Sequence, residues 1–132
     1  MLYLDASALV KLAVEERESE QLRVYLREHS QQPRFSSMLV HAEVLRAVRP
    51  IGADSVVKAR QSLASCFLVD VSRSILERAA MLDAASPLRT LDAIHMVTAS
   101  AAEDRLTAVV TYDLRMARAA NAMGYPVAAP GT

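Results

Sequence analysis

The chain has few of the residues on which several common kinds of functional site depend. Its 132 residues include a single cysteine, three glycines and no tryptophan. One cysteine, Cys66, excludes an internal disulfide and any zinc site built from several cysteines. The glycines, at positions 52, 124 and 131, are too far apart to form a glycine-rich phosphate-binding loop. The sequence therefore excludes P-loop and dinucleotide-binding proteins.

Excess charge of either sign is also lacking, because 15 basic residues balance 15 acidic ones. A neutral chain has no global positive field, so any binding of nucleic acid needs a local basic cluster. Only Lys11 and Lys58 are lysines, and the remaining basic residues are arginines. The planar arginine side chain suits phosphate and carboxylate binding. A GC-rich coding sequence produces the same enrichment, however, and is the simpler explanation.

Long apolar segments are absent as well. No uncharged stretch of about 18 residues is apolar throughout, so we expect no transmembrane helix. The apolar start of the chain lacks a basic leading segment and is interrupted by Asp5 and Lys11, which argues against a signal peptide. We therefore expect a cytoplasmic protein that forms one domain over residues 1–132.

Short apolar runs alternate with segments of helical periodicity along the chain. The runs predict strands at residues 2–4, 34–36, 67–69, 106–112 and 125–128, the last at a sheet edge. The periodic segments predict helices between them, with Ser7, Ser37, Ser72 and Thr90 as N-caps and Pro87 closing the helix that Ser72 begins. This alternation predicts an α/β fold, a three-layer α/β/α sandwich with a small, mostly parallel sheet.

Four acidic residues occupy positions where a solvent-exposed charge is not expected. Asp5 directly follows the first predicted strand, and Asp113 directly follows the strongest one. Glu43 lies within an amphipathic helix, and Asp92 lies one turn into another. In an open α/β sheet, ligands bind outside the carboxyl ends of the strands. If the two strands are neighbours, all four carboxylates can reach that edge.

Carboxylates gathered at one edge repel one another, by roughly 1–4 kcal/mol for a pair about 4 Å apart. A fold keeps such a cluster only if a cation occupies it. Oxygen ligands without thiolates favour Mg²⁺ or Mn²⁺ over zinc. Such an ion activates water and stabilises charge on a phosphate during hydrolysis. We therefore predict a Mg²⁺ or Mn²⁺ site.

Each of these carboxylates also has a simpler explanation. Asp5 and Asp113 can cap the helices that they precede, although Ser7 competes for the first of these caps. Asp92 can be a first-turn residue favoured by the helix dipole, and Glu43 can pair with an arginine three or six residues further along its helix. Independent caps have no reason to converge on one edge, so a shared site is the preferred interpretation.

Other catalytic motifs have less support. The sequence His41-Ala42-Glu43 matches part of the zinc-deaminase motif, but the required pair of cysteines is missing. No nucleophile-elbow motif of the serine hydrolases is present. Asp92 and His95 stand three residues apart and could ligate a metal together, but a histidine on a helix face more often serves packing or capping.

Four motifs, in order along the chain, resemble those of PIN-domain ribonucleases. They are L-D-A-S-A-L-V-K from residue 4, S-x-x-x-H-A-E-V-L-R from residue 37, L-D-A-I-H from residue 91, and V-V-T-Y-D-x-R-M from residue 109. The size and the two ends of the chain are similar to those of small bacterial toxins of the VapC type. The resemblance covers nearly the whole chain.

The resemblance implies a PIN-like fold and Mg²⁺- or Mn²⁺-dependent cleavage of cellular RNA by the toxin of a type II toxin–antitoxin pair. Asp5, Glu43, Asp92 and Asp113 would be both the catalytic residues and the metal ligands, supported by the hydroxyls of Ser7 and Thr111. It further implies a homodimer and an antitoxin protein whose C-terminal segment covers the active site. Many relatives carry another acidic residue shortly after the last motif, whereas this chain has Leu114 and Arg115. We therefore expect one tightly bound ion, with a second arriving with RNA.

Arginines near the acidic edge are the candidates for RNA binding. Arg89 precedes the helix of Asp92, and Arg115 and Arg118 follow Asp113. Arginines 46 and 49, beyond Glu43, come next. Such contacts to phosphate position RNA without reading its sequence. Ordinary surface arginines explain the same positions equally well.

Three other functions remain open at this stage. A receiver-like signalling module also binds Mg²⁺ at an acidic edge without being an enzyme, but it carries an acidic pair after its first strand, where Asp5 stands alone. A phosphatase of the D-x-D type is disfavoured because the chain has Asp5-Ala6-Ser7. A housekeeping PIN-fold nuclease that processes RNA fits these residues as well as a toxin does.

Overall fold

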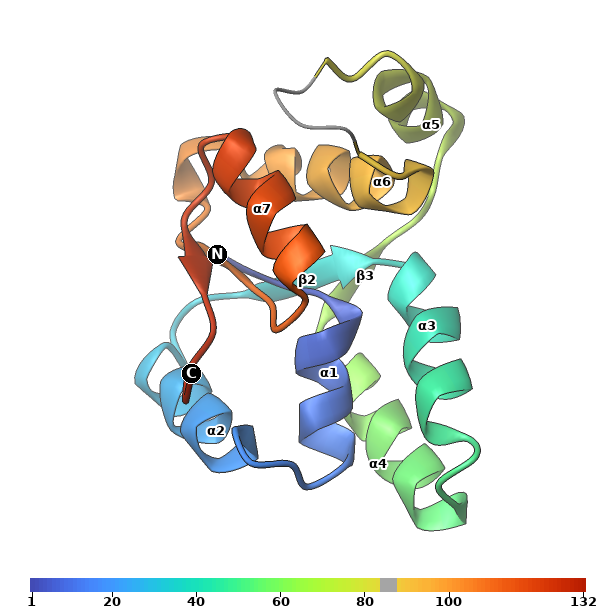
Figure 1. The fold of residues 1–132 in the computed structure, drawn as a ribbon, viewed down its shortest axis with the longest axis vertical. Helices are drawn as coiled ribbons and strands as arrows, with labels where there is room; N and C mark the ends of the chain where they lie inside the picture. The colour runs from blue at the N-terminus through green and yellow to red at the C-terminus, as the bar shows by residue number, and fades with distance from the viewer. Residues whose placement is uncertain (84–87) are drawn as a thin grey trace.

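A sheet of five parallel strands runs through the centre of the computed structural model, which describes residues 1–83 and 88–132 (Figure 1). The order across the sheet is β3-β2-β1-β4-β5, and every neighbouring pair is parallel. The strands are β1 (Leu2–Leu4), β2 (Arg34–Ser37), β3 (Phe67–Val69), β4 (Ala108–Val110) and β5 (Val127–Ala128). The predicted parallel sheet is therefore confirmed, and β5 lies at its edge as expected.

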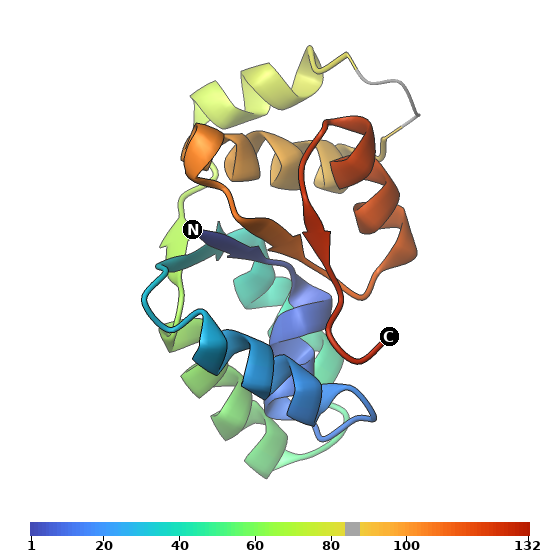
Figure 2. The same cartoon turned by 90° about the vertical axis from the view of Figure 1, so that its left-hand side faces the viewer.

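Helices cover both faces of this sheet, which confirms the predicted three-layer sandwich (Figures 1 and 2). One layer holds α1 (Ala6–Ala13), α2 (Ser19–Glu28), α3 (Leu39–Val48) and α4 (Ala53–Ala64). The other holds α5 (Arg73–Ala80), α6 (Thr90–Ala99) and α7 (Leu114–Ala122), with a 3₁₀ helix at Ser100–Arg105 that the sequence analysis missed. The predicted helix end at Pro87 lies outside the described residues.

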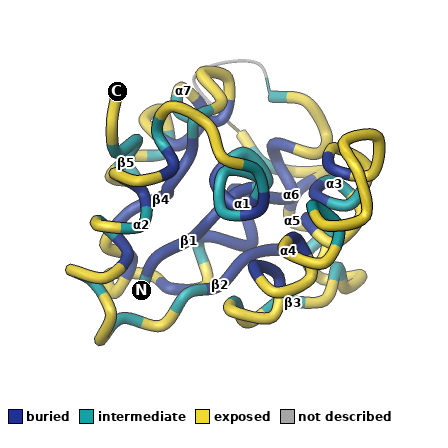
Figure 3. The backbone as a smooth tube through the Cα atoms, turned by 90° about the horizontal axis from the view of Figure 1, so that it is seen from below, coloured by how far each residue is buried: buried dark blue, intermediate teal, exposed yellow. Residues whose placement is uncertain are grey.

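The alternation of side chains along β1 divides the core between the two layers. Leu2 and Leu4 pack with α1 to α4, whereas Tyr3 between them packs with α6 and α7. All three are fully buried, as expected for the central strand of a parallel sheet (Figure 3). The short central strand is therefore held on both faces, which makes its carboxyl end a rigid support.

The strand order reverses between β1 and β4. From β1 the chain proceeds to β2 and β3 on one side, and it then crosses over to β4 and β5 on the other. The crevice outside the carboxyl ends of such strands is the usual ligand-binding position of an open α/β sheet. Asp5 follows β1 and Asp113 follows β4, and because these strands are neighbours, the condition for the two carboxylates to meet at one edge is fulfilled.

Strand β4 is shorter than predicted and ends at Val110. Thr111 stays extended beside the edge strand, because its N–H donates to the carbonyl of Ala128 at 3.0 Å. Asp113 therefore comes after a two-residue connection rather than directly after the strand. Alternating apolar residues cannot distinguish a paired strand from an extended connection that continues it.

Three predicted helix caps are wrong. Met38, not Ser37, occupies the cap position of α3. Asp5, not Ser7, caps α1, since its extended backbone ends β1 and its carboxylate accepts the N–H of Ala8 at 3.1 Å. Thr90 is the first residue of α6 rather than its cap, and Arg89 occupies the cap position. The predicted cap at Ser72 is confirmed, because its hydroxyl accepts the N–H of Ile75.

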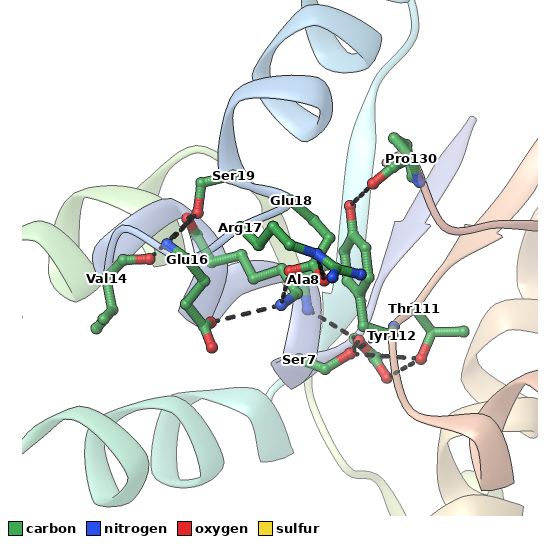
Figure 4. A network of polar contacts seen from close by, with 12 residues as sticks. Ser7, Ala8, Val14, Glu16, Arg17, Glu18, Ser19, Thr111, Tyr112 and Pro130 are labelled. Carbon is green, nitrogen blue, oxygen red and sulfur yellow. Dashed lines mark hydrogen bonds and ion pairs between the residues drawn. The ribbon is translucent and has the colours of Figure 1, made fainter. Parts of the chain in front are cut away.

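Tyr112 connects the end of β4 to both α1 and the C-terminal segment (Figure 4). Its hydroxyl donates to the carbonyl oxygen of Pro130 at 2.8 Å, and the Lys11 ammonium lies 4.6 Å from the centre of its ring. Lys11 also pairs with Glu18 at 2.8 Å, with only 16 % of the Glu18 side chain exposed.

None of the helices in the described parts of the chain is both long and apolar enough to span a membrane.

Candidate active site

A cavity of about 420 Å³ opens at the carboxyl ends of β1 and β4, and we call it the carboxylate cavity. The structure brings all four predicted acidic residues to its wall, from four separate segments of the chain. Two come from the connections after the strands, one from α3 and one from α6. They are Asp5, Asp113, Glu43 and Asp92. The predicted convergence on one edge therefore occurs.

Asp5 lies at the base of this site, with 3 % of its surface exposed. Its Oδ1 accepts hydrogen bonds from the Ser7 hydroxyl at 2.6 Å and from the Ala8 N–H, and its Oδ2 accepts one from the Thr111 hydroxyl. Burial raises the pKa of this carboxyl, and the three hydrogen bonds oppose that rise. The charged form of Asp5 is thus costly in the absence of a cation.

Ser7 and Thr111, the two predicted supporting residues, join the ends of β1 and β4 (Figure 4). The Ser7 oxygen accepts the N–H of Tyr112 at 2.8 Å, and the Thr111 oxygen accepts the N–H of Asp113 at 3.1 Å. Each hydroxyl therefore contacts the Asp5 carboxylate and the backbone of the connection that carries Asp113. This arrangement sets the position of one carboxylate relative to the other.

Asp113 and Asp92 each use one carboxylate oxygen at the start of a helix. Oδ1 of Asp113 accepts the N–H of Arg115 at 2.9 Å and caps α7. Oδ2 of Asp92, which is 7 % exposed, accepts the N–H of Arg89 at 3.3 Å. Their remaining oxygens make no hydrogen bond with any described residue. The capping explanation and the shared site are therefore compatible.

Glu43 is held by the buried His95, for which a packing or capping role was the preferred interpretation. Its Oε1 lies 2.9 Å from Nε2 of His95, and the other ring nitrogen of His95 lies 2.5 Å from the hydroxyl of Tyr3. A carboxylate only accepts hydrogen bonds, so the neutral ring carries its proton on Nε2 and accepts from Tyr3. Both ring nitrogens of His95 are therefore taken by protein partners in this conformation.

The sequence offered one signal for this arrangement, the three-residue spacing of Asp92 and His95. It did not reveal the partner, because Glu43 is 52 residues away. The proposed ion pair between Glu43 and an arginine of its own helix does not form among the described residues.

The donor set of the cavity fits a hard divalent cation, because its free ligands are carboxylate oxygens and no thiolate lies among its lining residues. Three or more acidic, histidine or cysteine side chains grouped closely enough to hold an ion do not occur within residues 1–83 and 88–132. Each carboxylate instead turns toward a protein donor. Hydrogen bonds from Ser7, His95 and the two helix starts stabilise the carboxylates in this conformation.

Two of the predicted RNA-binding arginines also line the carboxylate cavity. These are Arg89 and Arg115, whereas Arg118 lies outside it, along the next turn of α7. The arginines at positions 46 and 49 do not line it. The cavity thus combines an acidic interior with guanidinium groups at one side, a distribution suited to a phosphodiester backbone bound across a metal site.

This fold and this set of carboxylates define a PIN domain, and the family model described as "PIN domain" matches residues 2–122. The chain belongs to the PIN-domain family. It is 46 % identical over 129 residues to "Ribonuclease VapC46" of Mycobacterium tuberculosis, an alignment that spans 98 % of this chain and 97 % of that protein. It is also 38 % identical over 133 residues to "Ribonuclease VapC35" of the same species, spanning 99 % and 98 % of the two chains. The resemblance to VapC-type proteins is therefore confirmed.

Solved structures share the fold at lower identity. A "Toxin-antitoxin complex from Klebsiella pneumoniae" has a chain that superposes with a TM-score of 0.70 at 21 % identity, covering 98 % of each chain. The "Sarcin-Ricin loop cleaving toxin" VapC20 of Mycobacterium tuberculosis superposes with a TM-score of 0.67 at 16 % identity, covering 90 % of this chain and 95 % of that one.

Proposed function

We propose that this protein is a Mg²⁺- or Mn²⁺-dependent ribonuclease that cleaves cellular RNA as the toxin of a type II toxin–antitoxin system. The observation that carries the proposal is the convergence of four carboxylates, from four segments, on one cavity at the strand-order reversal. Relatives that align over nearly the whole chain are named ribonucleases, which supports the assignment of RNA as the substrate.

The metal would be held by Asp5, Glu43, Asp92 and Asp113. Their carboxylate oxygens are the hard ligands that Mg²⁺ and Mn²⁺ prefer. When bound, such an ion activates a water and neutralises charge that develops on the phosphate. It would also remove the cost of holding the buried Asp5 in its charged form.

The chain's own residues orient these ligands and the substrate. Ser7 and Thr111 hold the Asp5 carboxylate between two strand ends, and His95 holds Glu43. Arg89 and Arg115 line one side of the cavity and would bind a phosphate beside the scissile bond. Binding energy from these arginines would position the RNA for hydrolysis.

The partners of the protein belong to the same proposal. We expect a cognate antitoxin protein whose C-terminal segment covers the carboxylate cavity, a homodimer in solution, and action in the cytoplasm, where cellular RNA is found. A superposable chain from a toxin–antitoxin complex fits the first expectation.

Substitution of two ligands tests the proposed chemistry. Asp5→Asn and Asp113→Asn should each abolish Mg²⁺- or Mn²⁺-dependent cleavage of RNA, because they remove charge from the metal site while keeping the shape of the side chain. Asp70→Asn is a matched control, since Asp70 also follows a strand but is exposed and does not line the cavity. Cleavage at the wild-type rate by either of the first two variants, purified free of contaminating nuclease, would remove that residue from the site.

Expression of the chain alone tests the toxin role. Growth should stop, and sequencing of the 5′ ends of cellular RNA should show discrete new ends that are absent with Asp5→Asn. Co-expression of the neighbouring upstream gene should restore growth. Discrete ends without growth arrest would favour a housekeeping RNA-processing nuclease instead.

A further inference from the structure

We propose that a second cavity, next to the carboxylate cavity, binds the nucleotide adjacent to the bond that is cut and thereby sets a base preference at that position. This inference rests on the proposed ribonuclease function. It concerns a cavity of about 610 Å³ between the segment that precedes α6 and the first turns of α7. We call it the arginine cavity, and it is lined by Leu88, Arg89, Asp113, Leu114, Arg115, Arg118 and Ala119.

The two cavities share part of their walls. Arg89, Asp113 and Arg115 line both of them. A chain of nucleotides whose phosphate lies at the carboxylates can therefore extend past these residues into the second cavity. The volume lies within the range of roughly 300–1,000 Å³ that is usual for small-ligand sites. One nucleotide fits the space, and its phosphate would lie between the two shared arginines.

The charges favour a polyanion in the arginine cavity. Its three arginines form no ion pair with any carboxylate in the described parts of the chain. Arg23, by contrast, is paired with both Glu15 and Glu20 on the opposite layer. Guanidinium groups that have no ion-pair partner attract phosphate strongly and can bind it through two parallel hydrogen bonds.

The apolar part of the cavity suits the face of a base. Leu114 directly follows Asp113 and is 73 % exposed. Leu88 and the buried Ala119 also line the cavity. Leu114 and Arg118 are four residues apart on α7, so their side chains are neighbours on one helix face. The planar guanidinium of Arg118 can stack on the face of a base, and the Leu114 side chain beside it adds apolar contact without hydrogen-bond readout.

The combination predicts a division of roles. Arg118 would bind the phosphate on the far side of the nucleotide and contribute affinity for any sequence. Leu114 would contact the base and favour those bases that cover more apolar surface. The cavity would therefore set a graded preference at a single position beside the cut rather than a strict sequence.

The experiment compares Leu114→Ser and Arg118→Gln with two control variants on remote surfaces. Ile51→Ser replaces an exposed apolar residue between α3 and α4, and Arg105→Gln replaces an exposed arginine of the 3₁₀ helix that precedes β4. Binding is measured by fluorescence anisotropy in the non-cleaving Asp5→Asn protein, with a short labelled RNA of random sequence. Cleavage is measured separately in the otherwise native protein, by sequencing the ends of a random RNA pool.

In the binding assay, Arg118→Gln should weaken RNA binding about fivefold, and the log–log salt dependence should become shallower by about 0.7, the value for one lost contact on a single strand. Leu114→Ser should weaken binding about threefold through lost apolar contact. In the cleavage assay, Leu114→Ser should flatten the base preference at one position beside the cut. The two control variants should match the wild type in both assays.

Unchanged RNA affinity and unchanged base preference in both variants would overturn the proposal. If either variant loses antitoxin binding while its RNA binding stays intact, the proposal would also be overturned, because the cavity would then be a protein interface. If the wild type fails to cut RNA with either metal, the proposed function fails. The binding assay still judges the arginine cavity in that case, because it does not depend on cleavage.

Discussion

Buried Asp5 is the residue on which the rest of the site depends. It caps α1, accepts two hydroxyl hydrogen bonds and lines the carboxylate cavity at the same time. A buried carboxylate with a raised pKa binds its proton more tightly in the folded chain than in the unfolded one. At neutral pH the buried charge of Asp5 therefore lowers the stability of the folded chain, and a bound cation would relieve this electrostatic cost.

In EDTA, Asp5→Asn should therefore be more stable than the wild type at neutral pH. Asparagine keeps an oxygen for the Ser7 and Ala8 donors while it removes the buried charge. Burial raises the pKa of Asp5 in the folded chain. The protonated carboxyl therefore contributes to folding stability below the unfolded-state pKa of about 3.9, and this contribution is lost as pH rises through the folded-state pKa. The stability difference should thus disappear toward acid pH, as followed by thermal melting. Added Mg²⁺ should stabilise the wild type alone.

His95 is a positioning residue whose effect is separable from packing. His95→Ala should weaken Mn²⁺ binding several-fold, because Glu43 loses the partner that holds its Oε1 and becomes free to rotate. It should also destabilise the fold by about 1–3 kcal/mol, because the buried Tyr3 hydroxyl loses its acceptor. Isothermal titration with Mn²⁺ measures the first effect and melting the second. His95→Gln, which can still donate to Glu43, should recover part of the Mn²⁺ affinity. Wild-type Mn²⁺ affinity in His95→Ala would contradict the positioning role.

At the scale of elements, two helices begin at the carboxylate cavity and use its carboxylates as caps. Asp5 begins α1 and Asp113 begins α7, so the strand ends and the helix starts meet at the same residues. At Asp113 the cap satisfies the N–H of Arg115 with one oxygen and leaves the other without a partner among the described residues. A short connection between strand and helix can therefore serve the fold and the site together.

Substitutions at Asp113 should separate these two roles. Asp113→Asn keeps a good N-cap and should leave the melting temperature of the metal-free protein nearly unchanged, while it abolishes cleavage. Asp113→Ala loses the cap as well and should destabilise the protein by about 1 kcal/mol. Equal melting temperatures for the two variants would show that the capping bond to Arg115 contributes nothing to stability.

At the scale of the whole molecule, apolar surface remains exposed at one edge of the sheet. The apolar faces of α1 and α2 lie mostly within the core. Phe67, on edge strand β3, is 73 % exposed, and it borders a shallow groove formed with Leu63, Leu68 and Cys66. An unpaired strand edge with an exposed aromatic residue is a common site of self-association.

We therefore expect a homodimer at tens of micromolar, and we expect Phe67→Ser to weaken it about tenfold. Light scattering across a concentration series measures both quantities. Val57→Ser, an exposed apolar residue of α4 outside this groove, is the control. A monomeric wild type at these concentrations would contradict the expectation. An equally weak dimer in the control would mean that Phe67 has no special role.

The sequence by itself determined the order of elements and the identity of the acidic residues. The alternation of apolar runs with helical periodicity follows from local geometry, so the layers and the parallel sheet could be predicted. Asp5 and Asp113 could be placed at strand ends because the strands that precede them are short and apolar, but that these strands are neighbours came only from the structure. The errors at Ser7, Thr90 and the end of β4 are local, since several nearby polar groups compete for the same backbone donors.

Only the tertiary structure decided which of these side chains touch. The bond between His95 and Glu43 joins residues 52 positions apart, and the bond between Thr111 and Asp5 joins residues 106 positions apart. Such contacts depend on the crossing of α3 and α6 over the sheet and on the register of β1 with β4. No local pattern carries that information, because burial and pairing arise only when distant segments pack together.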